Sequence, residues 1–143
     1  MILPDVNVLL YALREDVPEY TTYRPWLDRI VGSDERFGLS DLVLSAVVRI
    51  ATQPRVYRRP LPTQDVLAYV DGLRSQPHAV VLRPGAAHWR HFTHLCRAAN
   101  ATGKLVADAY HAALAIEHGC EWVTTDRDFA RFPGLRWRHP LDA

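Results

Sequence analysis

The sequence is short of several features that mark particular classes of protein. Its two cysteines, Cys96 and Cys120, lie 24 residues apart and match no common metal-binding spacing. We therefore expect two ordinary thiols rather than a disulfide. No apolar run reaches the roughly 18 residues of a membrane-spanning helix, and no basic region precedes the apolar start. These absences predict a cytoplasmic protein with no membrane partner.

Lysine is also scarce. Lys104 is the sole lysine among the 17 basic residues, and the other 16 are arginines. Several arginines stand beside aromatic residues or proline, as in RPW (24–26), RVYRRP (55–60), WRHF (89–92) and RFPGLRWRHP (131–140). This pattern suits phosphate contact and base stacking. An arginine-rich composition can equally reflect a GC-rich genome, so charge alone leaves nucleic-acid binding open.

A chain of 143 residues is long enough for one sizeable core, so we expect a single domain over residues 1–143. Hydrophobic spacing predicts strands at 2–5, 37–40, 79–82, 121–125 and 135–138. It predicts helices at 6–13, 20–31, 42–52, 63–74, 86–99 and 104–118. Strands and helices that alternate with short connections favour an α/β fold around a mostly parallel sheet.

Single residues add detail to this pattern. Thr63 is the expected N-cap of its helix, and Ser40 or Asp41 is expected to cap the helix that follows the second strand. Gly119 is expected at the end of the helix over 104–118. Pro4 is anomalous, because proline cannot donate a hydrogen bond within a central strand.

Acidic residues follow two of the predicted strands. Asp5 ends the first strand and Asp126 comes just after the strand over 121–125, while Asp108 lies near the start of the late helix. In parallel α/β folds the carboxyl ends of the strands carry the polar site. Each acid also has an ordinary explanation, as a helix cap, a charge near a helix N-terminus or a loop residue.

Together the three acids are harder to explain in this ordinary way. Carboxylates that converge on one edge of a sheet repel one another unless a cation meets them. Mg²⁺ and Mn²⁺ prefer oxygen ligands and commonly bind only one or two carboxylates directly. The sequence therefore favours a divalent metal site.

Three stretches, spread along the chain in the same order, are similar to one family, and the resemblance extends over essentially the whole chain. They are LPDVNVLLYA (3–12), LSAVVRIATQPRVY (44–57) and DAYHAALAIEHGCEWVTTDRDFARFPGLRW (108–137). They resemble the PIN-domain ribonucleases, in particular the VapC-type toxins of bacterial toxin–antitoxin pairs. The resemblance implies a three-layer α/β/α PIN-like domain with a mostly parallel central sheet. It also implies a toxin that hydrolyses RNA with Mg²⁺ or Mn²⁺, a cognate VapB-like antitoxin and a homodimer.

Carried over by position, Asp5, Asp108 and Asp126 match the catalytic, metal-binding acids of the family. Thr124 matches the threonine before the last acid. Asn7 matches the small polar residue after the first acid, and its ordinary role as a first-turn helix residue stays open.

The chain departs from the family pattern at one position. VapC-like chains usually carry a glutamate where this sequence has Ala46, three residues before Arg49. Asp41 or Asp128 could replace that carboxylate, and the sequence does not decide between them.

Some residues are candidates for further roles. For RNA contact they are Arg49, Arg55 and the arginines between 127 and 138, each of which also fits a solvated surface. His111 lies three residues after Asp108, and a structural role is favoured for it.

Two alternatives belong to other classes. One is a catalytically weak or inactive PIN-like module that binds RNA or a partner without metal-dependent turnover. The other is a phosphoacceptor or phosphatase site, which also uses clustered acids. Against the latter, no DxD motif follows the first strand, and Lys104 precedes a helix instead of following a strand.

Overall fold

A computed structural model gives the positions of residues 1–56 and 58–142. Tyr57, part of the RVYRRP stretch, and Ala143 lie outside the described residues. The strands are β1 (Ile2–Pro4), β2 (Phe37–Ser40), β3 (Ala79–Leu82), β4 (Glu121–Val123) and β5 (Trp137–Arg138). The helices are α1 (Val6–Leu13), α2 (Tyr20–Gly32), α3 (Asp41–Ala51), α4 (Thr63–Arg74), α5 (His88–Ala98) and α6 (Lys104–Glu117), with a short 3-10 helix, η1 (Arg127–Arg131).

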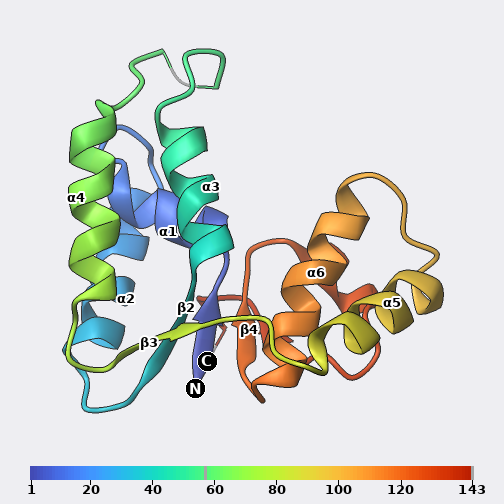
Figure 1. Cartoon of the computed structure of the whole chain (residues 1–143). Helices are drawn as coiled ribbons and strands as arrows, with labels where there is room; N and C mark the ends of the chain where they lie inside the picture. Colours follow the sequence, from blue (N-terminus) through green and yellow to red (C-terminus); the bar gives the residue numbers. More distant parts are fainter. Residues whose placement is uncertain (57, 143) are drawn as a thin grey trace.

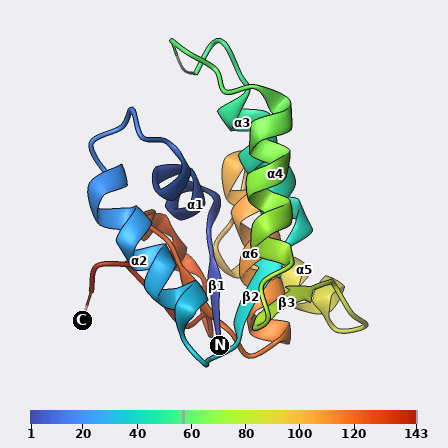
Figure 2. The ribbon, with the colours of Figure 1, turned by 90° about the vertical axis from the view of Figure 1, so that its left-hand side faces the viewer.

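The strands form one parallel sheet in the order β3-β2-β1-β4-β5. Figure 1 shows α5 and α6 on one side of the sheet and α2 and α4 on the other. Figure 2 shows α1 beside α2 and α3 beside α4, and both pairs are in contact. Parallel strands are buried on both faces, so helices must cover both. The predicted three-layer α/β/α fold is confirmed.

Pro4 lies at the end of β1, the central strand of the sheet. The next N–H group along the chain, that of Asp5, donates to the Val123 carbonyl of β4 at 2.9 Å. Since successive backbone donors of a strand point to opposite sides, the nitrogen of Pro4 faces β2. On that side, the one residue pair between β1 and β2 is Ile2 with Phe37. The proline therefore stands where the ladder to β2 has already ended.

Most expected elements are confirmed to within a few residues, and the differences lie at their ends. Ser40 caps α3 and Asp41 does not: the Ser40 hydroxyl accepts the Val43 N–H at 3.4 Å. Thr63 is the first residue of α4, and the capping position belongs to Pro62, which offers no side-chain acceptor. The expectation that Thr63 caps this helix was therefore wrong by one residue.

The C-terminal third follows the prediction with one addition. Gly119 follows His118, the C-cap of α6, and has a φ of 64°, the left-handed conformation that favours glycine there. Strand β4 ends at Val123, earlier than expected, because the next residues enter the loop of the site. Helix η1, which begins at Arg127, was not predicted.

The core fixes the edge of the sheet that carries the acids. Leu3 of β1 and Trp122 and Val123 of β4 are fully buried. Helix α6 packs on β4 and buries small residues such as Ala109 and Ala112 completely. Alanines let the helix approach the sheet closely, so the first turn of α6 is held near the ends of β1 and β4.

Two expected absences can be compared with the structure. Cys96 and Cys120 are both free thiols, as expected. Within residues 1–56 and 58–142, no helix combines the length and apolar character needed to cross a bilayer.

Candidate metal centre

An open pocket of about 220 Å³ lies at the carboxyl ends of β1 and β4. It is lined by Asp5, Val6, Asn7, Ala46, Arg49, Ile50, Lys104, Ala107, Asp108, His111 and Asp126. The structure thus brings together the three acids that the sequence singled out. A larger groove of about 460 Å³ has a mostly apolar lining that includes Leu42, Phe92 and Tyr110. The three acids predicted from the sequence therefore meet in the smaller pocket and not in this apolar groove.

Asp5 is one of two buried acids in the pocket, together with Asp108, and is 7% exposed. It is the N-cap of α1, where its carboxylate accepts the Val6 N–H at 2.6 Å and the Thr124 hydroxyl at 2.6 Å. Burial raises the pKa of Asp5 to about 6, although these two hydrogen bonds oppose the shift. The charges of Asp108 and Asp126 raise this pKa further. The cap explains why an acid precedes α1, but within residues 1–56 and 58–142 no cationic side chain forms an ion pair with Asp5.

Thr124 connects the two strand ends. Its buried Oγ1 donates to Asp5 and accepts the Asp126 N–H at 3.0 Å. The Asp126 carboxylate in turn accepts the Asp128 N–H at 2.9 Å and caps η1. This chain of hydrogen bonds fixes where the Asp5 and Asp126 carboxylates stand relative to each other.

Lys104 is a site residue that the sequence pattern did not reveal. Its Nζ donates to Asp108 Oδ2 at 3.0 Å and to Asp126 Oδ2 at 2.9 Å. Partial burial acts to lower the pKa of Lys104, but the bonds to both acids outweigh it and the net shift is upward. The sequence did contain one indication of this contact: Asp108 lies four residues after Lys104, so the two side chains share one face of the predicted helix.

The ammonium affects its two partners differently. Burial acts to raise the pKa of Asp126, but the Asp128 N–H and Lys104 outweigh it and the pKa is lowered. Burial raises the pKa of Asp108, and the bond to Lys104 only partly offsets this shift. The pocket therefore holds more negative charge than its single bound ammonium balances.

These residues have the donor chemistry that a hard divalent ion requires. Asp5, Asp108 and Asp126 offer carboxylate oxygens, which Mg²⁺ and Mn²⁺ prefer, and such ions complete their shells with water. Among the described residues, no three potential ligands are already placed to hold one ion together. Two of the acids, Asp108 and Asp126, instead hold the ammonium of Lys104, which shows that the cluster accepts a cation.

Ala46 lines the pocket, so the position at which the family resemblance led us to expect a glutamate does face this site. Neither suggested replacement joins it. Asp41 pairs with Arg74 at 3.1 Å on the exposed surface. Asp128 is exposed and does not line the pocket. Among the described residues, the fourth carboxylate is therefore missing from this pocket.

Asn7 and His111 also line the pocket. Asn7 is exposed in the first turn of α1, and the Asp5 carboxylate takes its hydrogen bonds from Val6 and Thr124. His111 stacks on Trp122 with ring centroids 5.4 Å apart, and its Nδ1 has no partner among the described residues. Burial, with a smaller effect of Lys104, lowers the pKa of His111 to about 4, so the ring is neutral at pH 7.

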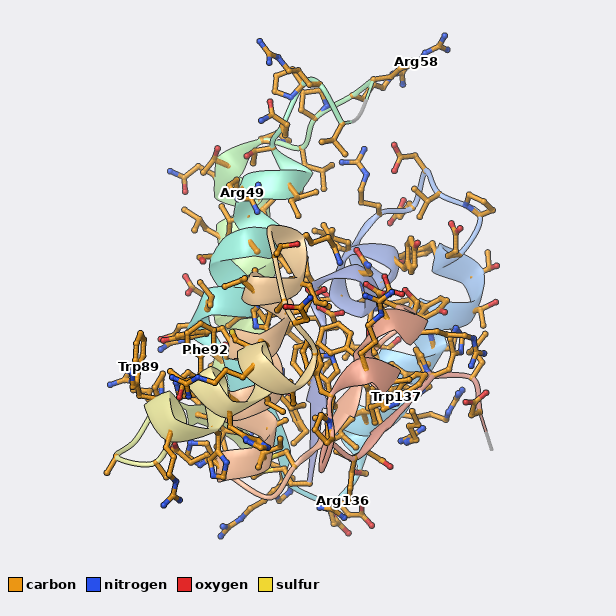
Figure 3. The ribbon with its side chains drawn as sticks, turned by 90° about the vertical axis from the view of Figure 1, so that its right-hand side faces the viewer. Arg49, Arg58, Trp89, Phe92, Arg136 and Trp137 are labelled. Carbon is orange, nitrogen blue, oxygen red and sulfur yellow. The ribbon has the colours of Figure 1, made fainter. Side chains whose placement is uncertain are left out.

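The candidate arginines are spread over the surface. Arg49 lines the pocket, and Arg55 is exposed in the turn after α3. Figure 3 shows Arg49 on α3 and Arg58 at the far tip of the following loop. Of these three arginines, Arg49 lines the pocket, whereas Arg55 and Arg58 lie on the exposed loop that continues from α3.

Two arginines of the C-terminal group lie elsewhere. Arg136 donates to the Gly119 carbonyl at 2.6 Å, and Arg138 pairs with Glu121 at 2.7 Å. Gly119 and Glu121 lie at the start of β4, whereas Asp126 of the pocket follows its end. These two arginines therefore support the sheet at the edge away from the pocket.

Comparison with known proteins places the chain among related sequences. A family model described as PIN domain matches residues 2–135. Ribonuclease VapC43 of Mycobacterium tuberculosis is 46% identical over 142 residues, covering 99% of this chain and 97% of that protein. Ribonuclease VapC25 of the same organism is 42% identical over 140 residues, covering 98% of this chain and 99% of that protein.

Solved structures share the fold at low sequence identity. The VapBC-1 structure from nontypeable Haemophilus influenzae has a TM-score of 0.72 at 15% identity, covering 99% of this chain and 100% of that chain. VapBC2 from Rickettsia felis, bound to a DNA fragment from its promoter, has a TM-score of 0.69 at 17% identity, covering 97% of this chain and 98% of that chain. At such identities the likeness establishes the fold alone.

Proposed function

Because the chain belongs to the PIN-domain family and is closely similar to VapC ribonucleases, we propose that it is a metal-dependent endoribonuclease acting as a toxin. One observation carries the proposal. Three acids from separate parts of the sequence converge on one pocket at the carboxyl ends of β1 and β4, where two of them already hold a cation. The proposed substrate is RNA, and the proposed metal is Mg²⁺ or Mn²⁺.

In this proposal Asp5, Asp108 and Asp126 hold the divalent ion. A bound ion of this kind neutralises charge on the phosphoryl group and makes a water molecule more acidic. Thr124 holds Asp5 and Asp126 in place through its two hydrogen bonds. Because these carboxylates are already held in place, they do not have to be reordered when the phosphodiester binds. This positioning lowers the entropic part of the activation barrier.

Arginines of α3 and of the loop that follows it are the proposed contacts with RNA. Arg49 lies in the pocket wall, close to where a phosphodiester would enter. Arg55 and Arg58 are exposed on the loop that continues from α3. Guanidinium groups bind phosphate oxygens in pairs of hydrogen bonds. We therefore expect the RNA strand to cross the pocket along this side.

One observation still supports the alternative of an inactive binding module: position 46 carries alanine in place of the carboxylate expected there. The relatives that share more than 40% of the sequence over nearly the full length are named ribonucleases, which favours the enzyme. The three acids and Thr124 that the chemistry needs are all present and brought together in this chain.

The proposed partners are a VapB-like antitoxin and a second copy of the chain. The two structures of similar fold described above are VapBC complexes. The surface also exposes large apolar side chains, such as Leu42 at 49% and Trp89 at 66%; Figure 3 shows Trp89 on the outside of α5. Leu42 and Phe92 line one apolar groove and Trp89 packs on Phe92, and contiguous apolar surface of this kind is typical of protein contacts.

Expression of this chain alone is expected to arrest bacterial growth. Co-expression of the antitoxin from the neighbouring open reading frame should restore growth, because the antitoxin would cover the pocket. The measurement is colony formation after induction of the chain alone and of the chain together with the antitoxin. Harmless accumulation of soluble protein that cleaves RNA in vitro would contradict the toxin role while leaving the ribonuclease intact.

The ribonuclease itself is tested by incubating purified protein with a panel of structured RNAs. Cleavage is expected with Mg²⁺ or Mn²⁺ and should stop when EDTA removes the ion. Adding back excess Mn²⁺ should restore it. Cleavage that continues in EDTA would contradict the metal dependence, and no cleavage of any RNA with either ion would favour the binding module.

A further inference from the structure

The ammonium of Lys104 lies where Asp108 and Asp126 converge. Its Nζ is 3.0 Å from Asp108 Oδ2 and 2.9 Å from Asp126 Oδ2. A cation held between these oxygens takes the place that a divalent ion would need. We propose that Lys104 is a tethered cation that fills the metal position of the pocket and has to be displaced when a divalent ion binds.

The position of Lys104 in the helix supports this role. It is the first residue of α6, where the unpaired backbone N–H groups carry partial positive charge and disfavour a cation. Gly103 precedes it with a φ of 57° and offers no side-chain cap. What balances the ammonium is the pair of acids, Asp108 one turn later and Asp126 on the loop after β4. Lys104 is thus oriented by the acid cluster rather than by the helix.

The ammonium can leave the pocket while the acids stay. The Lys104 side chain is 73% exposed, whereas Asp108 is 11% and Asp126 is 23% exposed. A lysine carries its charge on a flexible four-carbon stem, and ion pairs with an exposed partner are weak. Displacement therefore requires only rotation of the lysine side chain toward solvent.

A metal that binds must compete with this resident charge. Lys104 already lowers the repulsion between Asp108 and Asp126. A divalent ion that binds there therefore gains less electrostatic free energy than it would from two unpaired acids. Lys104 therefore competes with the ion and lowers the metal affinity of the free protein. The inference rests on the proposed function only in treating the pocket as a metal centre, and it does not require RNA cleavage.

The single lysine allows a direct spectroscopic test. Selective ¹³C labelling of lysine gives one set of side-chain signals, because Lys104 is the only lysine. Titration of the full chain with Mg²⁺ should move the Cε signal toward that of an unrestrained lysine, with the same saturation curve as calorimetry. Sodium chloride at equal ionic strength is the control and should leave the signal nearly in place.

The Lys104→Gln variant tests the competition without RNA. It should bind Mn²⁺ about 5- to 10-fold more tightly than the wild type in a calorimetric titration. Arg97→Gln is the matched control, since it removes the same charge from an exposed position on α5 outside the pocket. This control should keep the wild-type affinity.

Metal-free stability gives a second readout. In EDTA, Lys104→Gln should melt about 2–4 °C below the wild type, because the acids lose their counter-ion. Saturating Mn²⁺ should remove this difference, since the ion then balances the acids in both proteins.

The outcomes separate this inference from the proposed function. A Lys104 signal that stays fixed at Mg²⁺ saturation, or a wild-type Mn²⁺ affinity in Lys104→Gln, would overturn the inference even if the protein cleaves RNA. Tighter binding by Lys104→Gln in a protein that cleaves no RNA supports the inference and contradicts the function. Failure of both proteins to bind either metal contradicts both.

Discussion

Replacing Asp5 by asparagine is expected to lower RNA cleavage by at least about 100-fold, because the pocket loses one of its two buried carboxylates. The amide keeps the size of the side chain and one oxygen acceptor, so the cap of α1 is largely retained. The measurement is the rate of RNA cleavage in saturating Mn²⁺.

The same variant should be more stable than the wild type when no metal is present. The pKa of Asp5 is raised from its ordinary value of 3.8 to about 6, mainly by burial. An acid with a raised pKa stabilises the fold when protonated, and this stability is lost as the pH rises from about 4 through about 6. At pH 7 the lost free energy of unfolding is on the order of 3 kcal/mol. Asparagine carries no charge and avoids this loss, but it gives up one hydrogen bond, which is worth about 1 kcal/mol.

The free energy of unfolding in EDTA measures this effect. Asp5→Asn should exceed the wild type by about 1–2 kcal/mol at pH 7, and the advantage should vanish near pH 4. Asp71→Asn, an exposed acid on α4, is the matched control for charge and should alter neither cleavage nor stability. Undiminished cleavage by Asp5→Asn would remove Asp5 from the active site.

Introducing glutamate at Ala46 is expected to tighten Mn²⁺ binding by about 10- to 100-fold. Ala46 lines the pocket and is partly exposed, so a longer side chain has room to reach the acids. It would supply the fourth carboxylate that neither Asp41 nor Asp128 provides. The wild type should bind metal weakly, with Mn²⁺ ahead of Mg²⁺ as expected from their hydration demands and general affinities.

Ala46→Gln is the control for this prediction, because it adds the same bulk without the charge. Calorimetric titration of the three proteins with Mn²⁺ separates the effect of the carboxylate from that of the longer chain. Equal affinities for the glutamate and glutamine variants would show that the ion lies out of reach of α3.

The acids could be predicted from the sequence because local rules place them. Asp5 and Asp126 follow strands, and parallel strands end at the same edge of the sheet. Asp108 belongs to the first turns of a helix that must pack on β4. Each position follows from its own segment, and the topology brings the segments together.

Contacts between segments could not be predicted in the same way. Lys104 reaches Asp126 across 22 residues and two elements, so the sequence showed only its (i, i+4) relation to Asp108. Arg136 and Arg138 were candidates either for RNA contact or for a solvated surface, and in the structure they bind groups at the start of β4. Which end of a strand an arginine reaches depends on the register of β5 against β4, and two residues are too few to fix that from a pattern.

The most direct measurement is a crystal structure of the full chain with Mn²⁺, using anomalous scattering at the manganese edge. One or more anomalous peaks are expected within coordination distance of Asp5, Asp108 or Asp126, with the Lys104 ammonium moved away from Asp108 and Asp126. An anomalous map without a peak in this pocket, with Lys104 still between the two acids at saturating Mn²⁺, would contradict both the metal centre and the displacement of the lysine.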